Sequence, residues 1–179
     1  LDSGDIHITE PIVVQGQGSE TTAIIADSNS RIFDINAGSF FFQDDPDNEF
    51  FIRGVTLTGG RAQAFIGESD GGAISMDAGL FSNSPGGFLR LDDVHFINNR
   101  SEDGDGGAVR AENAIVQINN SRFTSNHGKD RGGAIHVDDG EVTITNSEFR
   151  DNFSVSGGVI SVESEAIVTI ENTTITDNE

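Results

Sequence analysis

Residues 121–146 read SRFTSNHGKDRGGAIHVDDGEVTITN, and residues 147–172 read SEFRDNFSVSGGVISVESEAIVTIEN. Aligned without a gap, the two 26-residue stretches share a leading Ser, a Phe, an Asn, several Ile or Val positions and a closing Asn. A fixed period of about 20 to 50 residues is the mark of a repeat architecture, in which each unit packs on its neighbours. We therefore expect the chain to be a stack of similar units.

Two motifs extend this repeat beyond the central stretch. An F-x-x-N motif begins at Phe96, Phe123 and Phe149, with a weaker copy at Ile175 and a degenerate one at Leu57. A G-G-A-[IV] motif begins at residues 71, 106 and 132, and residues 157–160 read G-G-V-I. Each full unit therefore contains one copy of each motif.

The alternation of polar and apolar residues predicts strands. Within one unit, residues 122–124, 134–137 and 142–145 alternate in this way and are separated by turns. Three short strands per unit, repeated in one direction, predict an all-β fold: a right-handed single-stranded parallel β-helix, or solenoid, of about 26 residues per coil. Equivalent residues of successive coils would then lie about 4.8 Å apart.

The predicted stacking gives columns of equivalent residues. Three inward columns are expected, namely Leu57, Phe96, Phe123, Phe149 and Ile175; Phe50, Leu89, Ile115 or Val116, Val142 and Val168; and Ile74, Val109, Ile135 and Ile160. Two further columns are expected at bends, namely Asn99, Asn126, Asn152 and Asn178; and Asp93, Asn120, Asn146 and Asn172. Stacked amides can bond to one another and to the turn backbone, so we interpret the Asn columns as structural ladders.

The units are not equally regular along the chain. We interpret residues 1–179 as a single β-helix segment of a longer protein, with irregular entry coils over 5–54, a coil with loop insertions over 55–93 and regular coils over 94–179. Excursions at 43–49, 61–70 and 80–87 are the loops in which we expect a partner surface, because loops on a solenoid commonly bind partners.

The charge of the chain restricts its partners. Thirty acidic residues against ten basic ones give a net charge of −20, which excludes a nucleic-acid binder because phosphate neutralisation needs a basic surface. No apolar run reaches the roughly 18 residues that a membrane span needs. There is no Cys, and therefore no thiol nucleophile or thiolate metal site. The acidic surface is typical of a protein that works outside the cell, at the cell surface or in high salt.

The motifs resemble those of a known family. The repeated G-G-A-I, G-G-A-V, F-I-N-N, F-T-S-N and F-R-D-N sequences are similar to the passenger repeats of polymorphic outer-membrane proteins and, more broadly, to the pectate-lyase-like superfamily of right-handed β-helices. The resemblance covers residues 55–179 well and 5–54 weakly. It implies either a rigid adhesive passenger or an enzyme that cleaves polysaccharides with acidic calcium ligands, and we find no matching ligand motif to transfer.

The candidate catalytic residues are Arg110 and His136, which the repeat places side by side on an outward row between Ser75 and Ser161. A histidine can take a proton from a sugar, and an arginine can offset a substrate carboxylate. The alternative interpretation is that both are ordinary solvated surface residues.

Calcium is the candidate cofactor, because carboxylates on loops suit this cation. Its candidate ligands are Asp44, Asp45, Asp47 and Glu49 on one loop, and Glu102, Asp103 and Asp105 on another. The alternative is that both loops are simply solvated.

We therefore expect an extracellular or cell-surface module with a structural or adhesive function. Its partners would be a cell-surface glycan or protein, or neighbouring segments of its own assembly. The alternatives are a polysaccharide lyase or hydrolase on the same fold, and a spacer without any ligand.

Overall fold

The computed structural model describes residues 4–26, 30–36, 49–63, 70–79 and 87–179. The expected loops at 43–49, 61–70 and 80–87 fall mostly outside these residues. Within them the secondary structure consists of strands, and no helix is present. The described residues hold no helix of the length and apolarity that crossing a bilayer requires.

Strands separated by turns make up the described structure, and most of them are short. They are β1 (Ile6–Ile8), β2 (Val13–Gln15), β3 (Ala23–Ile25), β4 (Phe33–Asn36), β5 (Glu49–Thr58), β6 (Arg61–Ala62), β7 (Ile74–Asp77), β8 (Gly87–Ile97), β9 (Arg100–Ser101), β10 (Val109–Glu112), β11 (Ala114–Asn119), β12 (Arg122–Thr124), β13 (His127–Gly128), β14 (Ile135–Asp138), β15 (Glu141–Thr145), β16 (Glu148–Arg150), β17 (Ile160–Glu163), β18 (Ile167–Glu171) and β19 (Thr174–Thr176).

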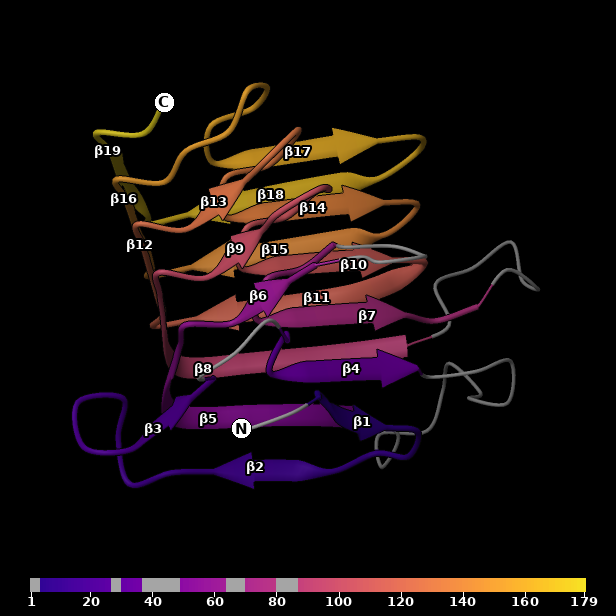
Figure 1. Ribbon diagram of the computed structural model, residues 1–179, viewed down its shortest axis with the longest axis vertical. Helices are drawn as coiled ribbons and strands as arrows, with labels where there is room; N and C mark the ends of the chain where they lie inside the picture. The colour runs from indigo at the N-terminus through magenta and orange to yellow at the C-terminus, as the bar shows by residue number, and fades with distance from the viewer. Residues whose placement is uncertain (1–3, 27–29, 37–48, 64–69, 80–86) are drawn as a thin grey trace.

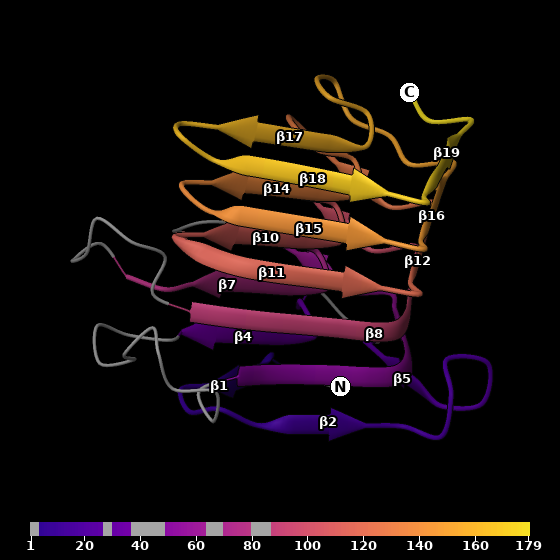
Figure 2. The same cartoon turned by 180° about the vertical axis from the view of Figure 1, so that it is seen from behind.

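The strands form parallel sheets whose neighbours come from successive units. Sheet A has six strands in the order β1-β4-β7-β10-β14-β17, and sheet C has β6, β9 and β13. Sheet B has ten strands, including β5, β8, β11, β15 and β18 along one face and β12, β16 and β19 beyond a bend. Figures 1 and 2 show these strands piled one above another along the long axis of the molecule. The all-β, parallel character expected from the sequence is therefore confirmed.

The division into sheets differs from the expectation of one sheet for each of the runs 122–124, 134–137 and 142–145. The first and third runs belong to the same sheet B, because β5 and β8 continue through the bend. Gly54 (φ 63°) and Asp93 (φ 52°) adopt left-handed backbone conformations within these long strands. This conformation turns the chain without ending the strand.

The predicted inward columns are confirmed by the strand register, except that Ile175, which aligns with Phe149, is 45% exposed. Phe96, Phe123 and Phe149 are aligned on adjacent strands and have no exposed surface. Their rings stack at centroid distances of 4.5 and 4.6 Å, close enough for favourable offset packing. In the second column the inward residue is Val116 and not Ile115, since Val116 aligns with Val142 and is buried. Continuous columns of this kind make one long apolar core.

The spacing between the last two units is not uniform. Val142 aligns with Val168, 26 residues on, whereas Ile135 aligns with Ile160, only 25 residues on. The turn before β18 therefore contains one more residue than the turn before β15. The segment before the Gly pair is one residue shorter in the last unit, since His127 aligns with Phe153 but Arg131 aligns with Ser156. An ungapped alignment of residues 121–146 with 147–172 therefore displaces the Gly pair by one position, and the longer turn before β18 restores the spacing.

The Gly pairs are required by the close approach of successive units. Gly106 has a φ of +64°, and a Cβ at Gly107 would lie 2.1 Å from the carbonyl oxygen of Gly133 in the next unit. The first position needs a left-handed backbone, and the second has no space for a side chain. The motif is therefore explained by turn geometry.

The inner Asn column is a ladder, as predicted. The side-chain Nδ2 of Asn126 donates to Oδ1 of Asn152 at 2.9 Å, and Nδ2 of Asn152 donates to Oδ1 of Asn178 at the same distance. The outer column differs, because within the described residues Asn120, Asn146 and Asn172 form no such bonds with one another. Their φ values of 51°, 50° and 49° and their exposure direct the amides to the surface.

Candidate functional site

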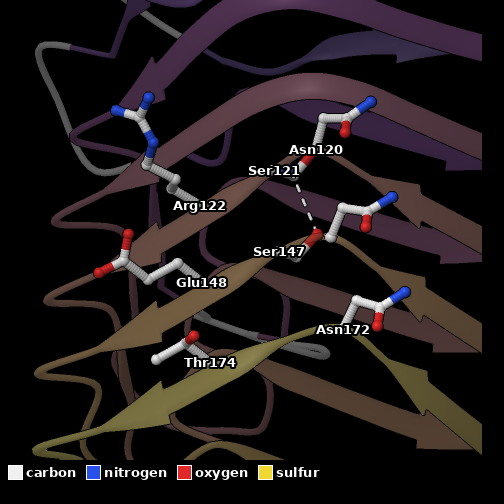
Figure 3. A pocket seen from close by; sticks show the side chains of 8 residues that line it. Asn120, Ser121, Arg122, Ser147, Glu148, Asn172 and Thr174 are labelled. Atoms are coloured by element: carbon white, nitrogen blue, oxygen red, sulfur yellow. Dashed lines mark hydrogen bonds between the residues drawn. The ribbon is translucent and has the colours of Figure 1, made fainter.

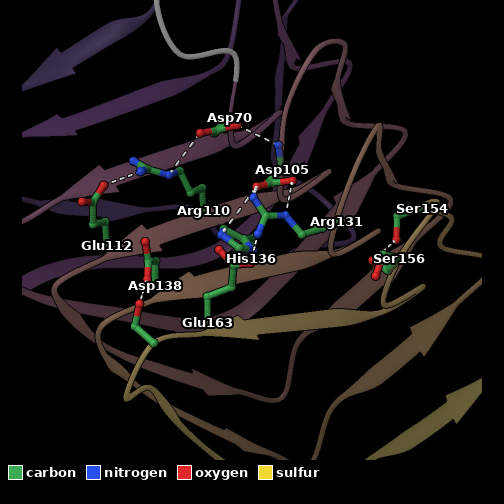
Figure 4. A network of polar contacts seen from close by, with 11 residues as sticks. Asp70, Asp105, Arg110, Glu112, Arg131, His136, Asp138, Ser154, Ser156 and Glu163 are labelled. Carbon is green, nitrogen blue, oxygen red and sulfur yellow. Dashed lines mark hydrogen bonds and ion pairs between the residues drawn. The ribbon is translucent and has the colours of Figure 1, made fainter.

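Arg110 and His136 lie side by side in the register of β10 and β14, as the repeat predicts. The expectation of a solvated surface at these positions is wrong, because only 7% of Arg110 and 3% of His136 is exposed. Asp70, Asp105 and Arg131, which lie in the segments that precede the Gly pairs, pack against this outer face of sheet A (Figure 4). The pair therefore belongs to a covered polar cluster.

The charge of Arg110 is balanced on two sides. Its Nε lies 3.2 Å from the carboxylate of Asp70, and its Nη2 donates to Glu112. Two carboxylates at one guanidinium leave it little capacity to bind the carboxylate of a substrate.

His136 is held in an enclosed environment. Its Nε2 lies 3.6 Å from Oδ2 of Asp105, which also pairs with Nη2 of Arg131 at 2.9 Å. Nδ1 of His136 is buried and has no hydrogen-bond partner among the residues described. Burial lowers the pKa of His136, while the Asp105 carboxylate acts in the opposite direction. The lowered pKa favours a neutral imidazole near pH 7.

The candidate calcium ligands are distributed over separate ion pairs. Glu102 pairs with Arg61 and Arg100, and Asp103 pairs with Lys129 at 2.8 Å.

Asp105 points toward Arg131 and His136, and Glu49 is the first residue of β5 and lies 3.8 Å from Nη1 of Arg90. Asp44, Asp45 and Asp47 are outside the described residues. In the part of the chain that is described, no group of three or more His, Asp or Glu side chains could hold a metal ion. Calcium binding stays a prediction.

A second polar region lies where sheet B bends, and we call it the corner groove. It is an open hollow of about 560 Å³. It crosses three successive units, at the ends of β11, β15 and β18 and the starts of β12, β16 and β19 (Figure 3). Its lining consists of Asn120, Ser121, Arg122, Asn146, Ser147, Glu148, Asn172 and Thr174.

Two columns of side chains border the corner groove. Asn120 and Asn172 project in the same direction along one side (Figure 3), and Asn146 lines the groove from the equivalent position of the unit between them. Arg122, Glu148 and Thr174, which are aligned in the register of their strands, form the other side. The left-handed conformation of each Asn ends one strand and starts the next, so the turn itself presents the amides.

The floor of the corner groove is fixed by hydrogen bonds between units. Ser121 and Ser147 are only 1% and 5% exposed. The hydroxyl of Ser147 accepts from the backbone N–H of Ser121 at 3.1 Å and donates to the carbonyl of Thr145 at 2.8 Å. Side chains that are held by such buried hydrogen bonds between strands are positioned more accurately than side chains on a loop.

Two charged residues line the corner groove, Arg122 and Glu148, and only Arg122 has an ion-pair partner among the described residues. Nη1 of Arg122 pairs with Oε1 of Glu20 at 2.6 Å. Glu148 is exposed, and its carboxylate forms no ion pair or hydrogen bond with any residue in the described ranges. The pKa of the neighbouring His95 is lowered by burial and then by Arg122, with Glu20 and Glu148 acting in the opposite direction.

The sequence contains both columns of the corner groove, but their proximity is not evident from it. The outer Asn column reads as a structural ladder, and Arg122 and Glu148 read as one outward row of surface residues together with His95. The signal that joins them is the short N-S-[RE] sequence at 120–122 and 146–148, which places the two columns on either side of a buried serine.

Searches of protein-family models, of curated proteins and of solved structures found no match to this chain. We therefore infer its function from the residues and their geometry.

Proposed function

We propose that this chain is a right-handed parallel β-helix segment that acts outside the cell as a structural and adhesive module and binds a glycan in the corner groove. The arrangement of strands supports the fold, because successive units add parallel strands to the same sheets. Connections between parallel strands of one sheet are right-handed in about 98% of cases. The motifs that resemble outer-membrane passenger repeats agree with this assignment.

The observation that carries the binding function is the corner groove itself. Its amides and hydroxyls recur in successive units, and strands in a sheet are about 4.8 Å apart. A glycan offers hydroxyl groups at regular intervals, so amides that both donate and accept can bond to several sugars in a row. The net charge of −20 favours a solvated protein outside the cell.

An alternative is a polysaccharide lyase or hydrolase that uses Arg110 and His136. It has less support, because both side chains are buried and Arg110 already faces Asp70 and Glu112. A cleavage assay on anionic polysaccharides, with and without Ca²⁺ and with Arg110→Ala as the control, tests this alternative. Turnover that disappears in the variant would replace the adhesive function with the enzymatic one.

Binding to immobilised glycans tests the proposed function, and Asn146→Gly is the informative variant. Glycine keeps the left-handed backbone (φ 50° at Asn146) and removes the amide. Asn98→Gly is the matched control, because Asn98 is also exposed, has a φ of 54° and does not line the corner groove.

We expect Asn146→Gly to weaken glycan binding and Asn98→Gly to leave it unchanged. Equal binding by both variants, or no binding to any glycan, would contradict the proposal.

A further inference from the structure

Glu148 is the exposed carboxylate at the centre of the corner groove. It stands between Arg122 and Thr174 in the column on the opposite side of the groove from the asparagines (Figure 3). Its side chain forms no hydrogen bond or ion pair with the residues that the structure describes. A ligand in the groove would therefore meet a negative charge at its middle unit.

The neighbouring arginine does not cancel this charge. The Arg122 guanidinium pairs with Glu20, which is 102 residues away in the sequence, at 2.6 Å. On the other side of the groove, Nδ2 of Asn120 donates to the carboxylate of Asp92 at 2.9 Å. The four ionic groups Glu20, Asp92, Arg122 and Glu148 together carry a net charge of −2. The field in the groove is consequently unfavourable for an anionic glycan and favourable for a cationic one.

We propose that the ligand of the corner groove is an amino-sugar glycan whose free ammonium groups pair with Glu148 while its hydroxyls bond to the Asn column. This inference rests on the proposed glycan binding and specifies its substrate class. A polymer of uronic acids would place carboxylates beside Glu148, which is repulsive. An N-acetylated polymer would offer hydroxyls and amides but no charge for Glu148. An ammonium group supplies three donors to a carboxylate that forms no hydrogen bond or ion pair within the described residues.

Three soluble probes separate these ligand classes: oligomers of glucosamine, of N-acetylglucosamine and of galacturonic acid. We expect the glucosamine oligomer to bind tightest, by about threefold for each ammonium that contacts an exposed carboxylate. The preference should shrink as salt is raised, because exposed charges are screened. Titration calorimetry measures all three affinities under one set of conditions.

The informative substitution is Glu148→Gln, and Glu141→Gln is its matched control. Glu141 is also exposed, precedes Glu148 by one strand and does not line the corner groove. We expect Glu148→Gln to bind the glucosamine and N-acetylglucosamine oligomers equally and Glu141→Gln to keep the preference. Thermal melts of both variants check that they fold, as expected for exposed positions.

Each outcome has a distinct meaning. Tightest binding of the galacturonic acid oligomer, or a preference for the amine that survives in Glu148→Gln, would overturn the amino-sugar inference. Equal binding of all three oligomers, abolished by Asn146→Gly, would overturn it while leaving glycan binding in place. No binding of any of these oligomers would overturn the inference, and the wider set of immobilised glycans then decides whether the proposed function fails with it. Oligolysine that binds as tightly as the glucosamine oligomer would show that charge alone is recognised, which also contradicts the inference.

Discussion

Removing one member of the inner Asn ladder should destabilise the protein strongly. Asn126 is 1% exposed, and its side chain forms four hydrogen bonds. Its Oδ1 accepts from the backbone N–H and from Nδ2 of Asn99, and its Nδ2 donates to the carbonyl of Phe96 and to Oδ1 of Asn152. In Asn126→Ala all four bonds are lost within the interior.

The magnitude follows from which groups keep a partner. Nδ2 of Asn99 still donates to the carbonyl of Leu57, and Oδ1 of Asn152 still accepts from the backbone N–H of residue 126. The backbone N–H of Asn99 keeps none of the bonds described, and an unsatisfied buried group costs about 1 to 3 kcal/mol. The other three bonds contribute about 0.5 to 1.5 kcal/mol each. We therefore expect the free energy of unfolding to fall by about 2.5 to 7.5 kcal/mol.

Equilibrium unfolding in urea measures this loss. Thr143→Ala is the control, because Thr143 is an exposed residue of β15, and it should change the free energy by less than about 0.5 kcal/mol. The denaturant slope should stay constant, which shows that the variant still folds to the same extent. A loss below about 1 kcal/mol in Asn126→Ala would refute the reasoning that the ladder satisfies buried groups.

Three further predictions concern the core, the turns and His136. Phe123→Ala should lower the free energy of unfolding by about 3 to 5 kcal/mol, because it opens a cavity in the stacked Phe column; a loss near that of an exposed substitution would contradict the stacking. Gly107→Ala should lower the melting temperature, since its Cβ would meet the carbonyl of Gly133 at 2.1 Å, and an unchanged melting temperature would count against this close approach. Burial lowers the pKa of His136 below 6.5, so the folded state binds fewer protons than the unfolded state, and stability should fall as the pH drops below about 6.5. His136→Gln should reduce that fall, and pH-dependent urea unfolding that is identical in both proteins would show that His136 does not contribute.

Much of the fold can be predicted from the repeat because a parallel stack aligns equivalent residues. Once Phe123 and Phe149 are recognised as equivalent, the neighbours of Arg110, Arg122 and Thr143 follow from the same period, and the register confirms them. Alternation then decides which residues face inward. The period does not show where a strand continues through a bend, since that depends on the backbone of Gly54 and Asp93.

The candidate sites are harder to predict because they depend on contacts between residues that the 26-residue repeat does not relate to one another. Asp70 and Asp105 cover Arg110 and His136 from segments whose lengths vary between units, so the burial of that pair is not visible in the sequence. Glu20 reaches Arg122 from 102 residues away, and no repeat relates these two residues. Because Arg122 pairs with Glu20, Glu148 is left without an ion pair in the described part of the chain. The free charge in the corner groove therefore becomes apparent only in the folded chain.

The most direct test of glycan binding in the corner groove is backbone amide hydrogen exchange with and without a saturating glucosamine oligomer. We predict increased protection confined to the three turns at 120–122, 146–148 and 172–174, which line the groove in successive units. Protection centred instead on Arg110 and His136, or no change at any of these turns, would contradict this account.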